Sequence, residues 1–428
     1  MRRLRDAQIF RCRHPRVTRV DETFVRVRQD AGRQLEAALE AIAQVAGSAA
    51  IVLMAAHVGS AVITAVRQRR RPSTAFERSE VPAITIIRPL KGIEPFTHAT
   101  LQSTFELAPA AAEILFCVES AADSVVPIVE RLISAHPHIS ARLLIGRDVI
   151  SSNPKLNNLA KGWQAASHPW IAFVDSNVLL PVDALVQLAA RIGPRTGMVC
   201  SPPVGCTQYG FASRLECAFL NGLQARWQST ADALCSGFAQ GKVMYFNREV
   251  IEAGGGLVAL GSEAAEDAAA TKLVRAKGLD VRLVDRFFEQ PIGRRTIRDV
   301  WDRQLRWAML RRASFPLHFA AEILSGGVPP VLLTLVASLA AGLPVLPMTM
   351  IVFGFWYGTE HILARLLGWP STVTGSIVRD ALTPLIWAKA WMSDDFTWHG
   401  NAMSAGREST ALNVGSAPHI EHSPGATR

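Results

Sequence analysis

Two arginines and a tryptophan in the C-terminal third of the chain are spaced for binding a phosphate group. Arg303, Arg306 and Trp307 stand at positions i, i+3 and i+4, so a helix places them on one face. A guanidinium group presents planar, paired donors that match the oxygens of a phosphate. Because a long uncharged stretch follows shortly afterwards, the motif predicts an anionic phosphate bound close to a membrane edge.

Two further charged residues stand where a predicted strand ends and where a predicted helix begins. Asp175 follows the apolar run 170–174, and a carboxylate there can bind a divalent ion that bridges two phosphates, or make only a local turn. Lys155 precedes a helical stretch and can contact phosphate together with helix N–H groups. Taken alone, a capped helix start explains the Lys155 segment better.

A third carboxylate can act as a base. Glu266-Asp267 follows the glycines at 254–256, which permit a close backbone approach to a ligand. A carboxylate within hydrogen-bond reach can deprotonate an acceptor hydroxyl. Acids that complement a helix dipole explain Glu263 and Glu266 and leave Asp267 open.

Composition limits the classes of protein to which the chain can belong. Of its 428 residues, 49% are hydrophobic, and the net charge is +9. The apolar residues are concentrated in segments, which predicts a soluble domain with membrane helices. The basic clusters flank these segments, as juxtamembrane arginines do, and this favours a membrane protein that does not bind nucleic acid. The six cysteines form no C-x-x-C pair, which is typical of a reducing compartment.

The elements that must position these residues divide the chain into successive regions. Short apolar runs alternate with amphipathic stretches, which predicts a doubly wound, largely parallel α/β sheet with ligands beyond the carboxyl ends of its strands. Arginines after the first apolar segment place this domain in the cytoplasm. The predicted regions are a basic tail (1–44), a transmembrane anchor (45–66), the α/β domain (81–290), an amphipathic interfacial helix (294–316), transmembrane or re-entrant helices (326–392) and a polar tail (400–428).

In their order along the chain, six motifs resemble the ceramide glucosyltransferase family, glycosyltransferase family 21, in a bacterial member. They are Arg88-Pro89-Leu90-Lys91-Gly92, Asn153 to Leu159, Asp175-Ser176, Gly254-Gly255-Gly256-Leu257, Ala265-Glu266-Asp267 and Arg303 to Trp307. The resemblance implies a Rossmann-like GT-A catalytic domain facing the cytosol, with an N-terminal anchor and C-terminal membrane helices. It also implies inverting transfer of glucose from UDP-glucose to the primary hydroxyl of ceramide.

The resemblance also implies roles for particular residues. Asp123 is expected near the nucleotide, Asp175 at a divalent metal (Mg²⁺ or Mn²⁺), and Asp267 as the general base. The motif at 303–307 is expected to contact the diphosphate and the acceptor region. Asn177 stands where a two-carboxylate metal motif would have its second acid.

Other functions stay open at this point. The same chemistry on a hopanoid or another membrane lipid fits a similar layout. A non-catalytic, membrane-bound binding protein is the alternative of another class, and the intact acids and arginines count against it. The expected location is the bacterial inner membrane, with several passes.

Overall fold

The computed structural model describes residues 19–70, 81–107, 112–398 and 401–404. The chain forms two compact units. The larger one comprises residues 53–329 and 353–428, and the smaller one residues 1–52 and 330–352.

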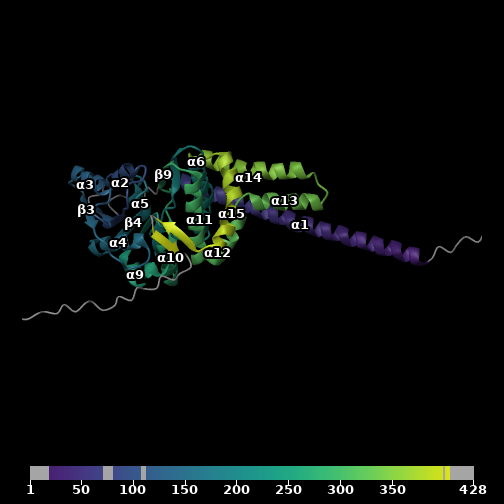
Figure 1. Ribbon diagram of the computed structural model, residues 1–428, viewed down its shortest axis with the longest axis horizontal. Helices are drawn as coiled ribbons and strands as arrows, with labels where there is room; N and C mark the ends of the chain where they lie inside the picture. Colours follow the sequence, from purple (N-terminus) through teal and green to yellow (C-terminus); the bar gives the residue numbers. More distant parts are fainter. Residues whose placement is uncertain (1–18, 71–80, 108–111, 399–400, 405–428) are drawn as a thin grey trace, which may run out of the picture. The chain divides into compact units, whose positions relative to one another are not determined.

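A seven-stranded mixed sheet is the centre of the larger unit, in the order β3-β2-β1-β4-β7-β5-β8. Two of its strands, β3 and β4, are labelled in Figure 1. Strands β1 to β4 run parallel, whereas β7 is antiparallel to β4 and β5. The carboxyl ends of β1, β2 and β4 therefore meet the start of β7 at one edge. The strands are β1 (Ile84–Pro89), β2 (Ala112–Val118), β3 (Ser140–Ile145), β4 (Trp170–Val174), β5 (Thr196–Cys200), β7 (Val243–Asn247) and β8 (Asp280–Leu283). This sheet confirms the predicted doubly wound α/β class.

Helices cover this sheet, and a second, two-stranded sheet of β6 (Val204–Tyr209) and β9 (Glu289–Arg294) lies apart from it. A π-helix, Ala218–Ala225, joins α6 to α7. The α-helices of this unit are α2 (Thr97–Phe105), α3 (Val126–Ala135), α4 (Pro154–Ala165), α5 (Ala184–Ala189), α6 (Phe211–Cys217), α7 (Arg226–Ala233), α8 (Arg248–Glu252), α9 (Gly256–Ala259), α10 (Glu266–Ala276), α11 (Ile297–Ser314), α12 (Pro316–Ala321) and α15 (Val373–Met392).

Helix α4 lies directly on β1 and β2. Gly162 makes this close approach possible, because a Cβ atom there would lie 2.5 Å from Ile87 Cγ2. The side-chain amide of Asn158 donates to the carbonyl oxygens of Leu90 (3.0 Å) and Cys117 (2.7 Å). The start of α4 is therefore fixed beside the carboxyl ends of these two strands.

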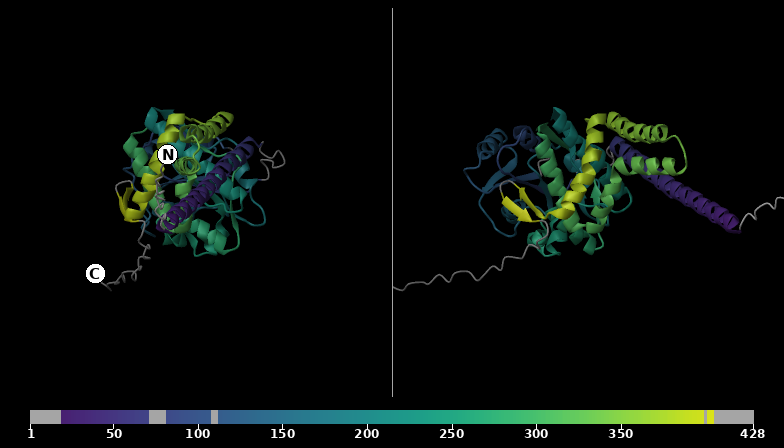
Figure 2. Two further views of the ribbon diagram at one scale, coloured as in Figure 1. Left: turned by 90° about the vertical axis from the view of Figure 1, so that its right-hand side faces the viewer. Right: turned by 45° about the vertical axis from the view of Figure 1, so that its right-hand side comes forward.

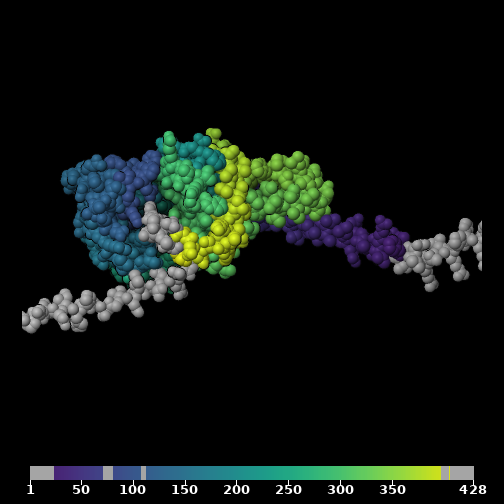
Figure 3. All heavy atoms as spheres, in the orientation of Figure 1, coloured from purple at the N-terminus to yellow at the C-terminus, as the bar shows by residue number. Residues whose placement is uncertain are grey.

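Helix α11 is the helix expected at 294–316, but its apolar side packs on protein. It begins with a capping box of Thr296 and Asp299. Val300 and Met309 are buried in a cluster with residues of α6 and α15, and Figure 3 shows α15, in yellow, crossing the surface beside α11. Helix α15 therefore covers these two residues, and the placement of α11 at a lipid interface stays a prediction.

Helix α1 (Arg19–Arg69) is longer than the predicted anchor. It begins at Arg19, so the part of the predicted 1–44 tail that the structure describes is helical. Its segment Phe24–Arg69 is the one described helix that is both long and apolar enough to cross a membrane. The successive helical segments Pro316–Ser325 and Val328–Ala340, bent by 61°, pass the same test only as a pair.

The C-terminal end of α1 belongs to the larger unit and is bonded to it. The Arg67 guanidinium, which is buried, lies 2.5 Å from Asp232 Oδ2 and also donates to the Leu283 carbonyl oxygen at 3.3 Å. Gln68 donates to the Asp285 carbonyl oxygen at 2.9 Å. Arg67, expected as a juxtamembrane charge, is thus also an internal ion-pair partner.

The smaller unit contains parts of three helices: α1, α13 (Val328–Ala340) and α14 (Val345–Leu367). Figure 2 shows α13 and α14 as an antiparallel pair joined by a short turn, in which Gly342 has a φ of 66°. The predicted pair of helices with a tight turn is therefore present. With 13 residues, α13 is about 20 Å long, which is less than a bilayer core requires. Its crossing of a membrane stays a prediction.

The last predicted membrane segment belongs to the larger unit. Helix α15 packs on α6, on α11 and on the π-helix, and its Arg379 and Asp380 are buried. A hairpin of β10 (Asp395–Trp398) and β11 (Asn401–Ser404) follows where the polar tail was expected to begin. The rest of that predicted tail, 405–428, lies outside the described residues.

Candidate active site

Lys155 joins two carboxylates at the sheet edge where β4 ends. Its Nζ atom lies 2.6 Å from Asp175 Oδ1 and 2.7 Å from Glu266 Oε1. It also donates to the carbonyl oxygen of Gly241 at 2.6 Å. Helix α4, the end of β4 and helix α10 therefore meet at one ammonium group.

A second lysine lies on the other side of Asp175. Val174 pairs with Val243 in the antiparallel β4–β7 register, so the next pair outward is Asp175 and Lys242. The Lys242 Nζ atom is 2.9 Å from Asp175 Oδ2 and 3.0 Å from Asn177 Oδ1. Both oxygens of the Asp175 carboxylate thus face an ammonium group.

The charges in this cluster shift the pKa values of its members. Burial alone would raise the pKa of Asp175, but the adjacent Lys155 and Lys242 lower it to about 2. Burial alone would lower the pKa of Lys155, but Asp175 and Glu266 hold it above its usual value. Asp175 is therefore a carboxylate, and Lys155 a cation, at every physiological pH.

Asp267, at the N-terminus of α10, has the opposite shift. Its Oδ2 accepts from the Gly241 N–H at 2.7 Å, and its Oδ1 accepts from the Ala268 N–H at 2.8 Å. Burial and the neighbouring Glu266 raise the pKa of Asp267 to about 6. A carboxyl group with this pKa can accept a proton near neutral pH, as a general base must.

Asn153 connects the two helices that carry these groups. Its Oδ1 accepts from the N–H groups of Lys155 (2.9 Å) and Leu156 (3.2 Å) and so caps α4. Its Nδ2 donates to Glu266 Oε2 at 2.9 Å. The capped helix start is confirmed, and the contact of Lys155 with phosphate stays a prediction.

The glycines before α10 have a role different from the expected one. Gly255 and Gly256 have φ values of 103° and 70°, which favour glycine in the turn between α8 and α9. A Cβ atom on Gly254 would lie 2.5 Å from the Leu273 side chain. The close approach of Gly254 is therefore to helix α10, and the approach of these glycines to a ligand stays a prediction.

Asp123 organises the loops that follow β1 and β2. Both of its carboxylate oxygens accept from the Gly92 N–H at 3.0 Å, and its Oδ1 accepts from the Val125 N–H at 2.9 Å. This places Asp123 at the same sheet edge as Asp175. Its contact with a nucleotide stays a prediction.

The arginine–tryptophan motif forms a second group on α11. Arg303 Nη1 is 3.1 Å from Oε1 of the buried Glu216, and its guanidinium carbon lies 5.8 Å from the Trp307 ring centroid. Burial and the nearby Arg303 lower the pKa of Arg306 to about 10. Within the described residues, no hydrogen bond or ion pair connects this group to Lys155, Asp175 or Asp267.

The donors around Asp175 do not fit a bound divalent cation. Mg²⁺ and Mn²⁺ prefer several oxygen ligands with negative charge. Here both Asp175 oxygens and the Asn177 Oδ1 accept from lysines. In the described part of the chain, no three His, Cys, Asp or Glu side chains form a group that could hold a metal ion. The metal role predicted for Asp175 stays a prediction without a matching ligand set.

The sequence analysis did not select three residues that shape these groups: Gly241, Lys242 and Glu216. Gly241-Lys242 directly precedes the apolar run 243–247. A glycine and a cation before a buried strand are the available signal, but the pairing of β7 with β4 is needed to interpret it. Glu216 has no signal in its own segment, because its partner Arg303 is 87 residues away.

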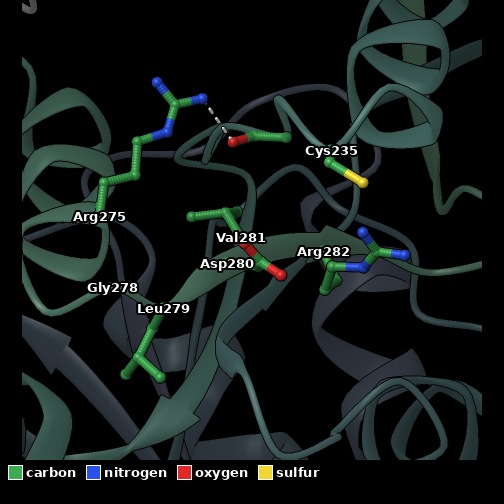
Figure 4. A pocket seen from close by; sticks show the side chains of 8 residues that line it. Cys235, Arg275, Gly278, Leu279, Asp280, Val281 and Arg282 are labelled. Atoms are coloured by element: carbon green, nitrogen blue, oxygen red, sulfur yellow. Dashed lines mark hydrogen bonds between the residues drawn. The ribbon is translucent and has the colours of Figure 1, made fainter.

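A cavity of about 270 Å³ lies apart from both groups (Figure 4). Arg275 at its rim donates to the Gly237 carbonyl oxygen at 2.8 Å. Its lining consists of Cys235, Gly237, Arg275, Gly278, Leu279, Asp280, Val281 and Arg282. None of the residues that the sequence analysis selected for the site lines this cavity.

One edge of the doubly wound sheet thus carries a carboxyl group with a raised pKa and two lysine ammonium groups. The sequence profile of Glycosyl transferase family 21 matches residues 42–411. The chain belongs to that family.

Curated relatives carry a more specific name. The chain is 22% identical to ceramide glucosyltransferase 3 of Caenorhabditis elegans, over 76% of this chain and 73% of the relative. It is 38% identical to a ceramide glucosyltransferase of Komagataella phaffii, over 32% of this chain and 27% of that relative. The second match thus spans only about a quarter of the yeast protein.

Among solved structures, the chain resembles the mannosyltransferase PcManGT from Pyrobaculum calidifontis, solved with GDP-Man and Mn²⁺. The two are 19% identical with a TM-score of 0.46, over 81% of this chain and 99% of that one. It also resembles the glucosyl-3-phosphoglycerate synthase of Mycobacterium tuberculosis, solved with Mn²⁺, UDP and phosphoglyceric acid. Here the identity is 15% and the TM-score 0.37, over 58% of this chain and 85% of that one.

Proposed function

We propose that this chain transfers glucose from UDP-glucose to the primary hydroxyl of ceramide, with inversion at the anomeric carbon. The observation that carries the proposal is that Asp267 and Lys155 both bond to Gly241, Asp267 to its N–H and Lys155 to its carbonyl oxygen. A carboxyl group with a pKa of about 6 therefore lies within electrostatic range of a cation at the ligand-binding edge of the sheet. The names of the curated relatives support the donor and the acceptor.

In the proposed reaction, the lipid hydroxyl oxygen attacks the anomeric carbon from the face opposite the diphosphate. Asp267 accepts the hydroxyl proton as the new C–O bond forms. The bond between the anomeric carbon and the phosphate oxygen breaks, and its electron pair leaves with UDP. One such displacement inverts the anomeric configuration and requires no covalent enzyme intermediate.

Cations near the departing diphosphate would lower the barrier, because negative charge develops on the leaving oxygen. Lys155 is held at the sheet edge by two carboxylates. Arg303 and Arg306 share one face of α11 and would contact the diphosphate from that helix. Trp307, beside Arg303, would border the acceptor.

The proposed location is the bacterial inner membrane, with the catalytic domain facing the cytoplasm. The α1 segment Phe24–Arg69, with a mean hydropathy of 2.1 over its most apolar window, supports an anchor. Several passes would additionally require α13 and α14 to cross. Ceramide is a membrane lipid, so an enzyme that uses it must work at the bilayer surface.

The test is release of UDP from UDP-glucose by the purified full chain in detergent micelles containing ceramide. We expect UDP release that depends on ceramide, and a β-glucosyl lipid as the product. Release with a hopanoid, but not with ceramide, would reassign the acceptor and retain the chemistry. Binding of UDP-glucose without turnover on any lipid would indicate a non-catalytic binding protein.

Replacing Arg306 with lysine tests whether the arginines of α11 bind the diphosphate. We expect Arg306→Lys to lower turnover about tenfold or more, because lysine keeps the charge but not the planar pair of donors. Arg298→Lys is the matched control, since Arg298 lies on the same helix with a side chain that is 90% exposed. Membrane partitioning, measured on the same samples, should be unchanged in both variants. Normal turnover of Arg306→Lys would show that the planar donors of Arg306 are not needed to bind the diphosphate.

A further inference from the structure

We infer that Lys242 supplies positive charge to the donor diphosphate in place of a divalent metal ion, an inference that rests on the proposed function. Its ammonium group occupies the position beside Asp175 where the sequence predicts a metal. The bound group would be the diphosphate of a nucleotide sugar.

The backbone holds Lys242 in this position. The Asp175 N–H donates to the Lys242 carbonyl oxygen at 3.0 Å, directly beyond the Val174–Val243 pair of the antiparallel register. Side chains at neighbouring positions across two strands lie within contact distance. The Cα atom of Lys242 is therefore fixed opposite Asp175, within reach of its carboxylate.

Two acceptors, Asp175 and Asn177, hold the ammonium group of Lys242 at the sheet edge. Lys242 Nζ contacts Asp175 Oδ2 at 2.9 Å and Asn177 Oδ1 at 3.0 Å, and its side chain is 12% exposed. These two acceptors leave one of its three N–H donors for a ligand oxygen. Asn177 in turn donates to Glu94 Oε2 at 3.3 Å, which orients its oxygen toward Lys242.

A divalent ion at Asp175 would compete with this arrangement. Lys155 occupies Oδ1 of the carboxylate and Lys242 occupies Oδ2. An added cation would have to displace one of them, or lie beside both against their repulsion. Asn177, in place of a second acid, lowers the negative charge that would attract a metal. The same substitution suits a lysine, because an amide oxygen accepts a hydrogen bond and adds no charge.

The charge balance explains why a second lysine is needed. Asp175, Glu266 and Asp267 carry up to three negative charges, and Lys155 alone would leave this cluster strongly anionic. An anionic cluster repels a diphosphate. Lys242 brings a second positive charge to the same edge, which offsets a second carboxylate and weakens this repulsion.

Binding of UDP to the full-length protein, measured by calorimetry in EDTA and again in Mn²⁺, tests this inference. We expect the wild type to bind UDP in EDTA, and Lys242→Met to bind it about 10- to 100-fold more weakly, as loss of a charged hydrogen bond implies. Lys242→Arg keeps the charge and should retain most of the affinity. The control is Lys272→Met. Lys272 lies on α10 and pairs with Glu263, and this variant should bind UDP like the wild type.

The outcomes separate this inference from the proposed function. UDP binding that requires Mn²⁺ and is the same in the wild type and in Lys242→Met overturns the role of Lys242 and leaves the proposed function intact. Failure of the wild type to bind UDP, with or without Mn²⁺, overturns the proposed function itself. Thermal unfolding of each variant confirms that the compared proteins are folded.

Discussion

Replacing Asp267 with asparagine should lower turnover by about two orders of magnitude or more, because asparagine keeps the size of the side chain but cannot accept the proton. The amide can still accept the hydrogen bond from the Gly241 N–H, which Asp267 now accepts at 2.7 Å. UDP-glucose binding should therefore be largely retained. Turnover and donor affinity, measured on the same preparation, separate the two effects.

The pH dependence gives a second measurement on the same variant. A base must be deprotonated to act, and the pKa of Asp267 is raised to about 6. Wild-type turnover should therefore fall as the pH drops through about 6, and this fall should be absent from the residual activity of Asp267→Asn. Asp280→Asn, at a carboxylate paired with Arg195, is the control and should keep the wild-type profile. Near-normal turnover of Asp267→Asn would remove this residue from the mechanism.

Replacing Lys155 with methionine should damage both stability and catalysis. The change leaves Asp175 and Glu266, which Lys155 contacts at 2.6 and 2.7 Å, without their shared cation. Removing one partner of a buried ion pair costs about 3–5 kcal/mol of the free energy of unfolding. Turnover should fall by about two orders of magnitude, since the positive charge of this ammonium would stabilise the charge that develops on the departing diphosphate.

Lys161→Met is a matched control on the same helix. The Lys161 side chain is 11% exposed, close to the 10% of Lys155, but its carboxylate partner Asp148 is 3.9 Å away. We expect a much smaller loss of stability and normal donor affinity. Denaturant unfolding and UDP-glucose turnover check both variants. Equal stability losses in the two variants would show that Lys155 contributes only general packing.

The sequence was sufficient to predict the sheet and part of the site, because those residues carry local signals. Strands β1, β2 and β4 are apolar runs buried on both faces, and Asn153 is a recognisable helix cap. The relation between Lys155 and Asp175 follows from helix α4 lying on a parallel sheet. The positions of these residues can thus be predicted where one element and its neighbour decide them, whereas their functional roles stay predictions.

The missed residues depend on contacts between segments that are distant in sequence. Lys242 meets Asp175 only because β7 inserts antiparallel beside β4, an interruption that alternating strands and helices do not predict. The apolar face of α11 also fits a lipid interface equally well until α15 is known to cover it. In both cases the local pattern is correct, but the segment that decides its interpretation is distant in sequence, 67 residues away for Asp175 and Lys242.

The bond between Arg67 and Asp232 has a consequence for how substrates reach the enzyme. The bonds of Arg67 and Gln68 hold the C-terminal end of α1 against the rest of the larger unit. If this end of α1 lies at the bilayer surface as proposed, the fold of the larger unit sets the distance from that surface to Asp267. The enzyme would then discriminate between acceptor lipids by the depth of their hydroxyl group in the bilayer as well as by its chemistry.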